Sequence, residues 1–266
     1  QPLESSSGWM LGDHTKANDI DYYRLSVGAS IVGIVFQPGG AGEVGRSGDG
    51  SDNDSTFTVL SADGQSILAQ LRQSDMTSAC AATFFCDIQF RSPPDEAEVL
   101  LRVEGPAAPS ARSYYTVQSG ALQTVFLEPE GDALDANNDG PSNALEPNRN
   151  SFAGTLDDEN DVDWWIVGEQ GLGDLTGRCR AAVLGSGLVD VEVQAFRLSS
   201  NGVGEPEARL VERPDRWIEF GPNRFSSVAP SLPGGEPYLV RIQAGGVRVD
   251  VSSRHYQCTF VGTGGR

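Results

Sequence analysis

The chain has 266 residues, of which 38% are hydrophobic, 32 are glycine and 15 are proline. This length allows one or two domains, and short apolar runs broken by glycine and proline favour an all-β fold. The net charge of −18, from 37 acidic and 19 basic residues, argues against nucleic acid and anionic membrane surfaces as partners. No apolar run reaches the roughly 18 residues of a membrane span, so we expect no membrane insertion.

The four cysteines divide evenly between the two halves of the chain, with Cys80 and Cys86 in the first and Cys179 and Cys258 in the second. This partition predicts one disulfide bond in each half and an oxidising compartment, although four cysteines allow three pairings. A Cys179–Cys258 bond would stabilise the fold by roughly 4 kcal/mol through loop-closure entropy. The chain begins at Gln1 without methionine, which we interpret as a secretion leader already removed.

In the first half, the alternation of apolar residues predicts strands over residues 21–27, 30–36, 56–60, 66–71, 98–104, 113–118 and 122–127. Residues 79–90 carry Cys80 and Cys86, and a disulfide bond between them would close a small loop. Ser61-Ala62-Asp63-Gly64 predicts a turn that joins strands 56–60 and 66–71 in a hairpin. We predict a second hairpin from 98–104 and 113–118. Residues 37–55, rich in Gly, Asp and Ser, are predicted to form a surface loop, with a second cation site as the alternative.

The acidic stretch 129–146 has almost no apolar content and is predicted to link a domain over 1–128 to a domain over 147–266. In the second domain we predict strands over 161–167, 180–184, 189–198, 238–243, 247–252 and 255–261, with 238–243 and 247–252 forming a closing hairpin.

The two halves repeat one motif. Asn160-Asp161-Val162-Asp163-Trp164-Trp165 matches Asn18-Asp19-Ile20-Asp21-Tyr22-Tyr23. Four landmark pairs are separated by nearly the same offset along the chain, namely Glu4 with Glu146, Asp19 with Asp161, Asp63 with Asn201, and Arg102 with Arg241. This nearly constant spacing predicts an internal duplication. Within each motif, the two aspartates point to the same side of an extended chain.

The second half resembles the bacterial pre-peptidase C-terminal (PPC) domain. The resemblance rests on Glu146-Pro147-Asn148, on the Asp-x-Asp-aromatic strand that follows this segment, and on a strand ending in Asn201-Gly202. The closing strand Tyr238-Leu239-Val240-Arg241-Ile242 completes it. The first half matches with Asp19-Ile20-Asp21-Tyr22, Asp63-Gly64 and Leu100-Leu101-Arg102-Val103, but has Glu4-Ser5-Ser6 in place of Glu-Pro-Asn.

This resemblance implies two tandem jelly-roll β-sandwich domains in a secreted or cell-surface bacterial protein. In collagen-binding relatives from bacterial collagenases, the opening segment and the Asp-x-Asp strand hold calcium. Carried over by position, the ligands in the second domain are Glu146, Asn148, Asp161 and Asp163. In the first domain Glu4, Asp19 and Asp21 remain, and the missing asparagine argues against a calcium site there.

A second calcium pattern lies in the acidic stretch. Asp135, Asn137, Asp139, Gly140 and Glu146 have the spacing of an EF-hand loop, in which alternate oxygen ligands converge around a glycine bend. Pro129 and Pro147 argue against the flanking helices of a full EF-hand. We therefore predict Ca²⁺ within residues 135–163, with a solvated acidic linker as the alternative.

The sequence carries no catalytic pattern. His14 and His255 are predicted at the surface, the P-loop and dinucleotide motifs are absent, and Gly185-Ser186-Gly187 is more simply a turn than a nucleophile elbow. The two histidines and the cysteine spacing also argue against zinc. Because one ring of each aromatic pair faces outward, we predict Trp165 and Trp217 as ligand contacts.

Together these features predict a non-catalytic, calcium-binding protein of the bacterial surface that serves in attachment or assembly. The alternative is a module that binds a polysaccharide or an extracellular protein beside a secreted enzyme. A hydrolase that depends on His14 or His255 is the third possibility.

Overall fold

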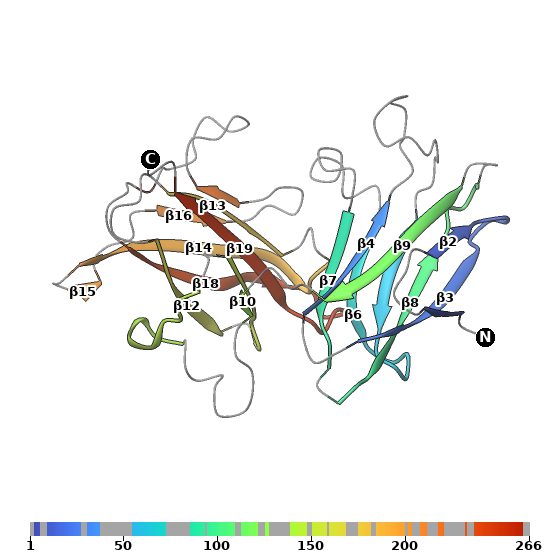
Figure 1. Cartoon of the computed structure of the whole chain (residues 1–266), viewed down its shortest axis with the longest axis horizontal. Helices are drawn as coiled ribbons and strands as arrows, with labels where there is room; N and C mark the ends of the chain where they lie inside the picture. Colours follow the sequence, from blue (N-terminus) through green and yellow to red (C-terminus); the bar gives the residue numbers. More distant parts are fainter. Residues whose placement is uncertain are drawn as a thin grey trace, which may run out of the picture. The chain divides into compact units, whose positions relative to one another are not determined.

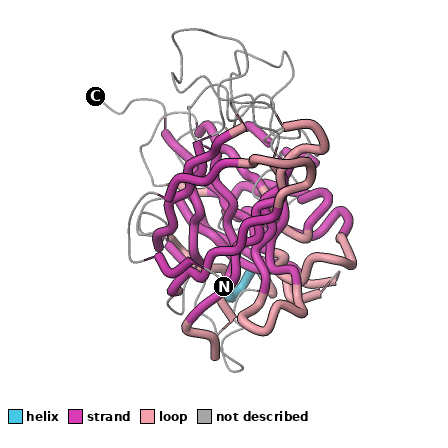
Figure 2. Tube along the Cα trace, turned by 90° about the vertical axis from the view of Figure 1, so that its right-hand side faces the viewer, coloured by secondary structure: helices cyan, strands magenta, loops and turns pink. Residues whose placement is uncertain are grey.

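The computed structural model describes part of the chain in detail, and the statements below concern that part. The described residues are 3–5, 10–27, 31–37, 55–72, 86–93, 95–109, 113–121, 126–127, 139–147, 151–158, 160–168, 175–181, 185–199, 202–203, 208–211, 218–220, 232 and 237–262. Almost all regular structure among them is β-strand, and the one short 3-10 helix is η3 (Pro141–Asn143) (Figure 2). The all-β prediction is confirmed. No described helix has the length and apolar character needed to cross a membrane.

The chain divides into two compact units, each with its own core. Unit 1 comprises Gln1–Gln123 together with Val183–Gly187 and Val249–Ser253, and unit 2 comprises Thr124–Ala182, Leu188–Arg248 and Arg254–Arg266. Each unit contains two β-sheets whose apolar faces enclose one cluster of buried side chains. This is the architecture of a β-sandwich.

Nine strands are described in unit 1, coloured from blue to green in Figure 1. They are β1 (Leu3–Ser5), β2 (Met10–Asp13), β3 (Ile20–Ser26), β4 (Ile31–Gln37), β5 (Thr56–Leu60), β6 (Ile67–Arg72), β7 (Cys86–Arg91), β8 (Glu98–Glu104) and β9 (Tyr114–Ala121). One sheet has the order β1-β3-β8-β5-β6 and the other β2-β9-β4-β7. The chain crosses repeatedly between the two sheets, and β2 to β9 have the strand order of a jelly roll.

Unit 2 repeats this topology with ten described strands. They are β10 (Phe126–Leu127), β11 (Ser151–Thr155), β12 (Val162–Val167), β13 (Leu175–Arg180), β14 (Leu188–Ser199), β15 (Gly202–Val203), β16 (Ala208–Val211), β17 (Ile218–Phe220), β18 (Tyr238–Val247) and β19 (His255–Gly262). One sheet has the order β10-β11-β19-β13-β17, and the other β12-β18-β14-β15, with β16 also paired to β14. The predicted β-sandwich is confirmed in both units.

The strand register supports the duplication inferred from the sequence. Tyr22 lies opposite Arg102 in unit 1, and Trp164 lies opposite Arg241 in unit 2. The opening segments also correspond, because Leu3 pairs in parallel with Tyr23 and Leu145 pairs in parallel with Trp165. The Leu145 bridge shows that part of the stretch predicted as a linker lies against β12.

The core of unit 2 contains the disulfide bond predicted from the sequence. Cys179 and Cys258 lie directly opposite each other on β13 and β19, are fully buried, and are bonded. Nearby, the Trp165 ring stacks on Phe152 with 4.1 Å between ring centroids. The predicted Cys80–Cys86 pairing lies outside the described residues, since only the backbone of Cys86 is described.

Two of the three predicted hairpins are wrong, that of 98–104 with 113–118 and that of 238–243 with 247–252. Strands β8 and β9 belong to different sheets, because in a jelly roll most consecutive strands alternate between the layers. The predicted hairpin of 238–243 and 247–252 is instead the single strand β18, which continues to Val247 along the twelve-residue β14. The strand predicted at 180–184 is β13, which ends at Arg180, and β11 had no prediction.

Candidate metal centre

Three carboxylates converge beside the first residues of β12. Asp161 directly precedes this strand, Asp163 is its second residue, and Asp139 comes from the segment before η3. One carboxylate oxygen from each lies within 4.8 Å of those of the other two. The group runs from the surface inward, because Asp139 is exposed, Asp161 is half-buried and Asp163 is buried.

Backbone pairing places Asp139 close to the other two aspartates. The Leu145 amide donates to the Trp164 carbonyl at 3.0 Å, and the Ile166 amide donates to the Leu145 carbonyl at 2.7 Å. These two bonds hold the segment of residues 139–147 alongside β12. The Asp-x-Asp spacing brings the other two carboxylates together, because side chains two residues apart in a strand point to the same side.

The local environment raises the pKa of Asp161. Burial is the main cause, and the negative charges of Asp139 and Asp157 add to it. Two backbone amides oppose this rise, since Asp157 donates to Oδ2 at 2.6 Å and Val162 donates to Oδ1 at 2.7 Å. The carboxylate is therefore held in place but carries its charge among other acids.

Asp163 is anchored from the opposite sheet. The Tyr256 hydroxyl of β19 donates to Asp163 Oδ2 at 2.6 Å, and the Trp165 indole Nε1 donates to the Tyr256 hydroxyl at 2.7 Å. All three side chains are buried, with Asp163 at 2% exposure. The sequence analysis did not identify Tyr256. Tyr256 and Tyr115 are separated in the sequence by nearly the offset of the repeat, so the duplication could have indicated that they are equivalent.

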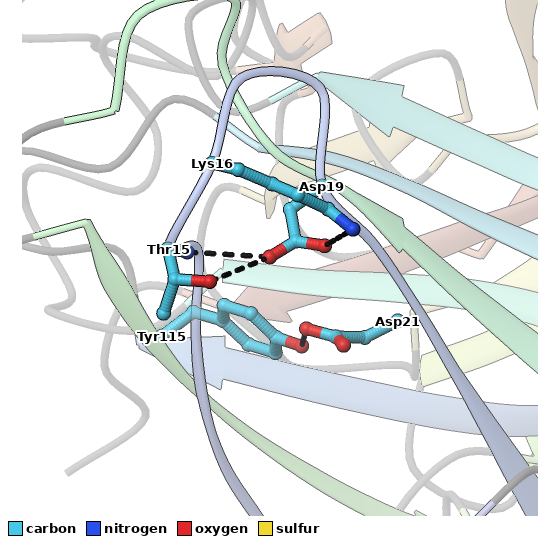
Figure 3. Close-up of polar contacts among 5 residues, drawn as sticks. All are labelled: Thr15, Lys16, Asp19, Asp21 and Tyr115. Atoms are coloured by element: carbon cyan, nitrogen blue, oxygen red, sulfur yellow. Dashed lines mark hydrogen bonds and ion pairs between the residues drawn. The ribbon is translucent and has the colours of Figure 1, made fainter.

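Unit 1 has the same framework with a different charge. Tyr115 donates to Asp21 Oδ2 at 2.6 Å (Figure 3). The Tyr23 and Tyr115 hydroxyls are 2.8 Å apart. The Thr15 amide donates to Asp19 Oδ2 at 3.2 Å, as the Asp157 amide does to Asp161. Here, however, the Lys16 ammonium lies 3.5 Å from Asp19 Oδ1.

The pKa of Asp19 shifts in the opposite direction from that of Asp161. Desolvation raises the pKa of Asp19, but hydrogen bonds from Thr15 and the charge of Lys16 outweigh it and leave the pKa below its usual value. At the offset that relates Asp161 to Asp19, the position of Lys16 is occupied by Asp158. Unit 1 thus has a built-in cation where unit 2 has another acid.

The cluster fits a hard divalent cation better than zinc. Calcium takes six to eight oxygen ligands, and three carboxylates offer up to six oxygens in addition to backbone carbonyls and water. The group contains no cysteine or histidine, which zinc prefers.

The cluster combines the two ligand sets predicted from the sequence and completes neither. Asp139 comes from the EF-hand-like pattern, whereas Asp161 and Asp163 come from the Asp-x-Asp strand. Glu146 is exposed and is not part of the group. Asp135, Asn137 and Asn148 lie outside the described residues.

The prediction that Trp165 contacts a ligand is wrong. Its ring is fully buried against Phe152, and its indole N–H donates a hydrogen bond to the Tyr256 hydroxyl. Trp164 points to the other face of the sheet and is also buried, packed against Phe196 and Leu239. Trp217 lies outside the described residues.

Comparisons with known proteins do not establish a family. No protein-family model matches the chain, and no curated protein matches it. Among solved structures, the chain is similar to CUB1-EGF-CUB2 of rat MASP-1, with 7% identity, TM-score 0.28, and 97% of this chain and 99% of that chain covered. It is also similar to the CBM22-1-CBM22-2 tandem of Paenibacillus barcinonensis Xyn10C, with 11% identity, TM-score 0.25, and 96% and 94% covered. Because no family model and no curated protein matches, the resemblance to the PPC domain rests only on short sequence motifs.

The two histidines are not at the surface, contrary to the sequence prediction. His14 is 1% exposed and its Nε2 lies 2.7 Å from the Ser55 hydroxyl, while His255 is fully buried in β19. Burial lowers the pKa of both imidazoles. The His14–Ser55 pair has the residue types of a hydrolytic dyad, but Ser55 is fully buried and His14 Nδ1 has no hydrogen-bond partner to orient it.

Proposed function

We propose that the chain is a non-catalytic extracellular module of two jelly-roll sandwiches, in which unit 2 binds Ca²⁺ through Asp139, Asp161 and Asp163. The observation that carries this proposal is the convergence of their carboxylate oxygens within 4.8 Å. Like charges this close, one of them on a buried side chain, repel strongly unless a cation or a proton neutralises them.

The repeat supports a cation rather than a proton. Both units keep the two strand aspartates and the tyrosine bonded to the second one. Unit 1 adds Lys16, whereas unit 2 adds Asp139 and has Asp158 at the lysine position. This difference in charge at the equivalent site is explained if unit 2 receives its positive charge from solution.

The bound ion would supply positive charge and would be coordinated by the carboxylate oxygens of the three aspartates. Its effect on this chain is to fasten the segment of residues 139–147 to β12, in addition to the two Leu145 hydrogen bonds. That segment lies within unit 2, between β10 and β11, so the ion would stiffen the first part of unit 2. Rigid attachment suits a spacer or a building block of a cell surface.

The location and the absence of catalysis are also part of the proposal. A buried disulfide bond between Cys179 and Cys258 fits an oxidising compartment, which favours secretion. The buried His14–Ser55 pair has no access to substrate, which argues against a hydrolase built on it. A purified chain lacking hydrolytic activity toward esters, peptides and glycosides would agree with this.

Isothermal titration calorimetry with CaCl₂ tests the ion site directly. We expect one site per chain with a Kd of about 10⁻⁴ to 10⁻³ M, the range of extracellular modules. Asp139→Asn and Asp161→Asn should each weaken binding, whereas the matched unit 1 variant Asp19→Asn should leave it unchanged. Binding that is absent, or that responds equally to Asp19→Asn, contradicts the proposal.

A second candidate function is ligand binding beside a secreted enzyme. The observation that favours it is the exposure of Ile20 and Tyr22, two large hydrophobic side chains on one face of β3. Exposed aromatic residues on an otherwise polar surface mark interaction sites.

A further inference from the structure

The outward face of the unit 1 sheet β1-β3-β8-β5-β6 carries an exposed aromatic ring. Tyr22 is 42% exposed and Ile20 is 44% exposed, and both lie on the side of β3 opposite to the buried Tyr23 and Leu25. Burying large apolar side chains is favourable, so two left open side by side on a strand require an explanation.

A row of polar side chains continues from Tyr22 across the sheet. In register, Tyr22 lies opposite Arg102, Arg102 opposite Thr58, and Thr58 opposite Gln70. The Gln70 amide donates to Thr58 Oγ1 at 3.1 Å, which fixes the outer end of the row. At about 4.8 Å between strands, the row spans roughly 14 Å perpendicular to the strands.

Arg102 at the centre of this row has few partners. Its Nη2 reaches Thr58 Oγ1 only at 3.5 Å and Glu104 Oε2 at 3.9 Å, and its Nε is buried and has no partner among the described residues. The side chain as a whole is 28% exposed, and four of the five N–H donors of a guanidinium are on its two terminal nitrogens. Donors beside an exposed ring are what a ligand with hydroxyl acceptors requires.

The charges on the face indicate an uncharged ligand. Arg24 is paired with Glu98 at 2.8 Å and Arg102 lies near Glu104, so the positive charges have acidic neighbours on the same face. The whole chain carries a net charge of −18, which repels polyanions. The exposed apolar part is also far smaller than the core of a stable protein interface, which favours a narrow ligand.

The same face in unit 2 is closed. There Trp164 occupies the position of Tyr22 but is only 9% exposed, packed with Phe196, Leu239 and Ala144. Arg241 lies over its ring at 6.0 Å and donates to Gln194 at 3.3 Å. The duplicated face therefore has an open copy in unit 1 and a self-filled copy in unit 2.

We propose that the open face of unit 1, formed by Ile20, Tyr22, Arg102 and Gln70, binds a neutral polysaccharide lying across the strands. A sugar ring stacks on Tyr22, and the hydroxyls of the sugar accept from Arg102 and bond to Gln70. The inference rests on the proposed role as a non-catalytic extracellular module, but it does not involve the calcium site.

Affinity electrophoresis in gels containing galactomannan, mixed-linkage glucan or the acidic polysaccharide alginate tests this binding. We expect at least one neutral polysaccharide to retard the chain, equally with calcium and with EDTA. Tyr22→Ala should weaken the retardation about tenfold and Tyr22→Phe should retain most of it, because the ring supplies the stacking surface. Arg102→Gln should also weaken it, whereas the matched unit 2 variant Arg241→Gln should not.

Several outcomes would overturn the proposal. These are no retardation by either neutral polysaccharide, retardation by alginate alone, or retardation unchanged by Tyr22→Ala in protein whose circular dichroism is native. Capture on immobilised collagen that Tyr22→Ala abolishes would replace the sugar by a protein partner and would also overturn it. Loss of retardation in EDTA alone would contradict independence from calcium, whereas failure of the calcium titration leaves this test unaffected.

Discussion

At the scale of single residues, Tyr256 connects the carboxylate cluster to the core of unit 2. Its hydroxyl accepts from the Trp165 indole N–H at 2.7 Å and donates its own proton to Asp163 at 2.6 Å. Partners behind a metal ligand fix its orientation and usually change metal affinity when they are removed. Tyr115 holds Asp21 in the same way in unit 1, where Lys16 already supplies the charge.

This difference makes Tyr256→Phe and Tyr115→Phe a matched pair. Each removes a hydroxyl that makes two hydrogen bonds, so each should lower the free energy of unfolding by about 1–3 kcal/mol. Only Tyr256→Phe should also weaken calcium binding, by roughly 10-fold or more. Calorimetric titration of both variants checks this, and equal calcium affinity in the two would show that Tyr256 does not position a ligand.

His255 makes the stability of unit 2 dependent on pH. Burial, together with the nearby charge of Arg180, lowers its pKa to about 3. The unfolded chain takes up this proton near pH 6.5, so the stabilisation is complete above about pH 6.5 and is lost as the pH falls toward 3. The loss amounts to at most about 1.4 kcal/mol for each pH unit.

We therefore expect His255→Asn to flatten the pH dependence of stability between about pH 6.5 and pH 4. Urea unfolding at a series of pH values measures the free energy of unfolding of the variant and of the unchanged chain. If the two lose stability in parallel as the pH falls, His255 is not the group responsible.

At the scale of elements, the turn before the Asp-x-Asp strand decides the charge of the site. In unit 1 this turn carries Lys16, and in unit 2 the equivalent position carries Asp158. The conformation of the turn is otherwise similar. The Thr15 amide donates a hydrogen bond to Asp19 in unit 1, and the Asp157 amide donates one to Asp161 in unit 2.

Asp158→Lys should transfer the built-in cation of unit 1 to unit 2. We expect it to weaken calcium binding more than Asp158→Ala does, because alanine removes one negative charge whereas lysine adds a positive one. In EDTA the lysine variant should be more stable than the unchanged chain by about 0.2–1 kcal/mol, as for a partly exposed ion pair. Thermal unfolding in EDTA and in calcium measures both effects, and identical behaviour of the two variants would argue against a charge-controlled site.

Elements with clear two-residue alternation were well predicted from the sequence, as β5, β6 and β8 show. Pairing was predicted correctly only for the hairpin of β5 and β6, because a jelly roll places most consecutive strands in different sheets and sequence adjacency then misleads. The buried histidines were missed for a related reason, since their hydrogen-bond partners or packing neighbours come from distant strands. Asp139, Asp161 and Asp163 were all predicted as ligands, but two separate motifs had to fold together before they formed one group.

At the scale of the whole molecule, the chain consists of two copies of one jelly roll with different surfaces. In unit 1, Lys16 lies beside Asp19 and the outward face of β3 exposes Tyr22. In unit 2, three aspartates cluster and Trp164 is packed against Phe196 and Leu239. Duplication of a stable sandwich allows such division, because changes at a few surface positions do not affect the core. We therefore propose cation binding for unit 2 and ligand contact for unit 1.

Hydrogen–deuterium exchange of the whole chain, with calcium at about ten times its Kd and then with EDTA, tests the central claim most directly. A ligand at about ten times its Kd stabilises the folded state that binds it by roughly 1.4 kcal/mol, which slows exchange through opening of the site. We predict that calcium slows exchange in peptides covering β12 and residues 139–147, and leaves the equivalent peptides covering β3 unchanged. Equal protection of β3 and β12, or no protection of either, would contradict the assignment of a calcium site to unit 2.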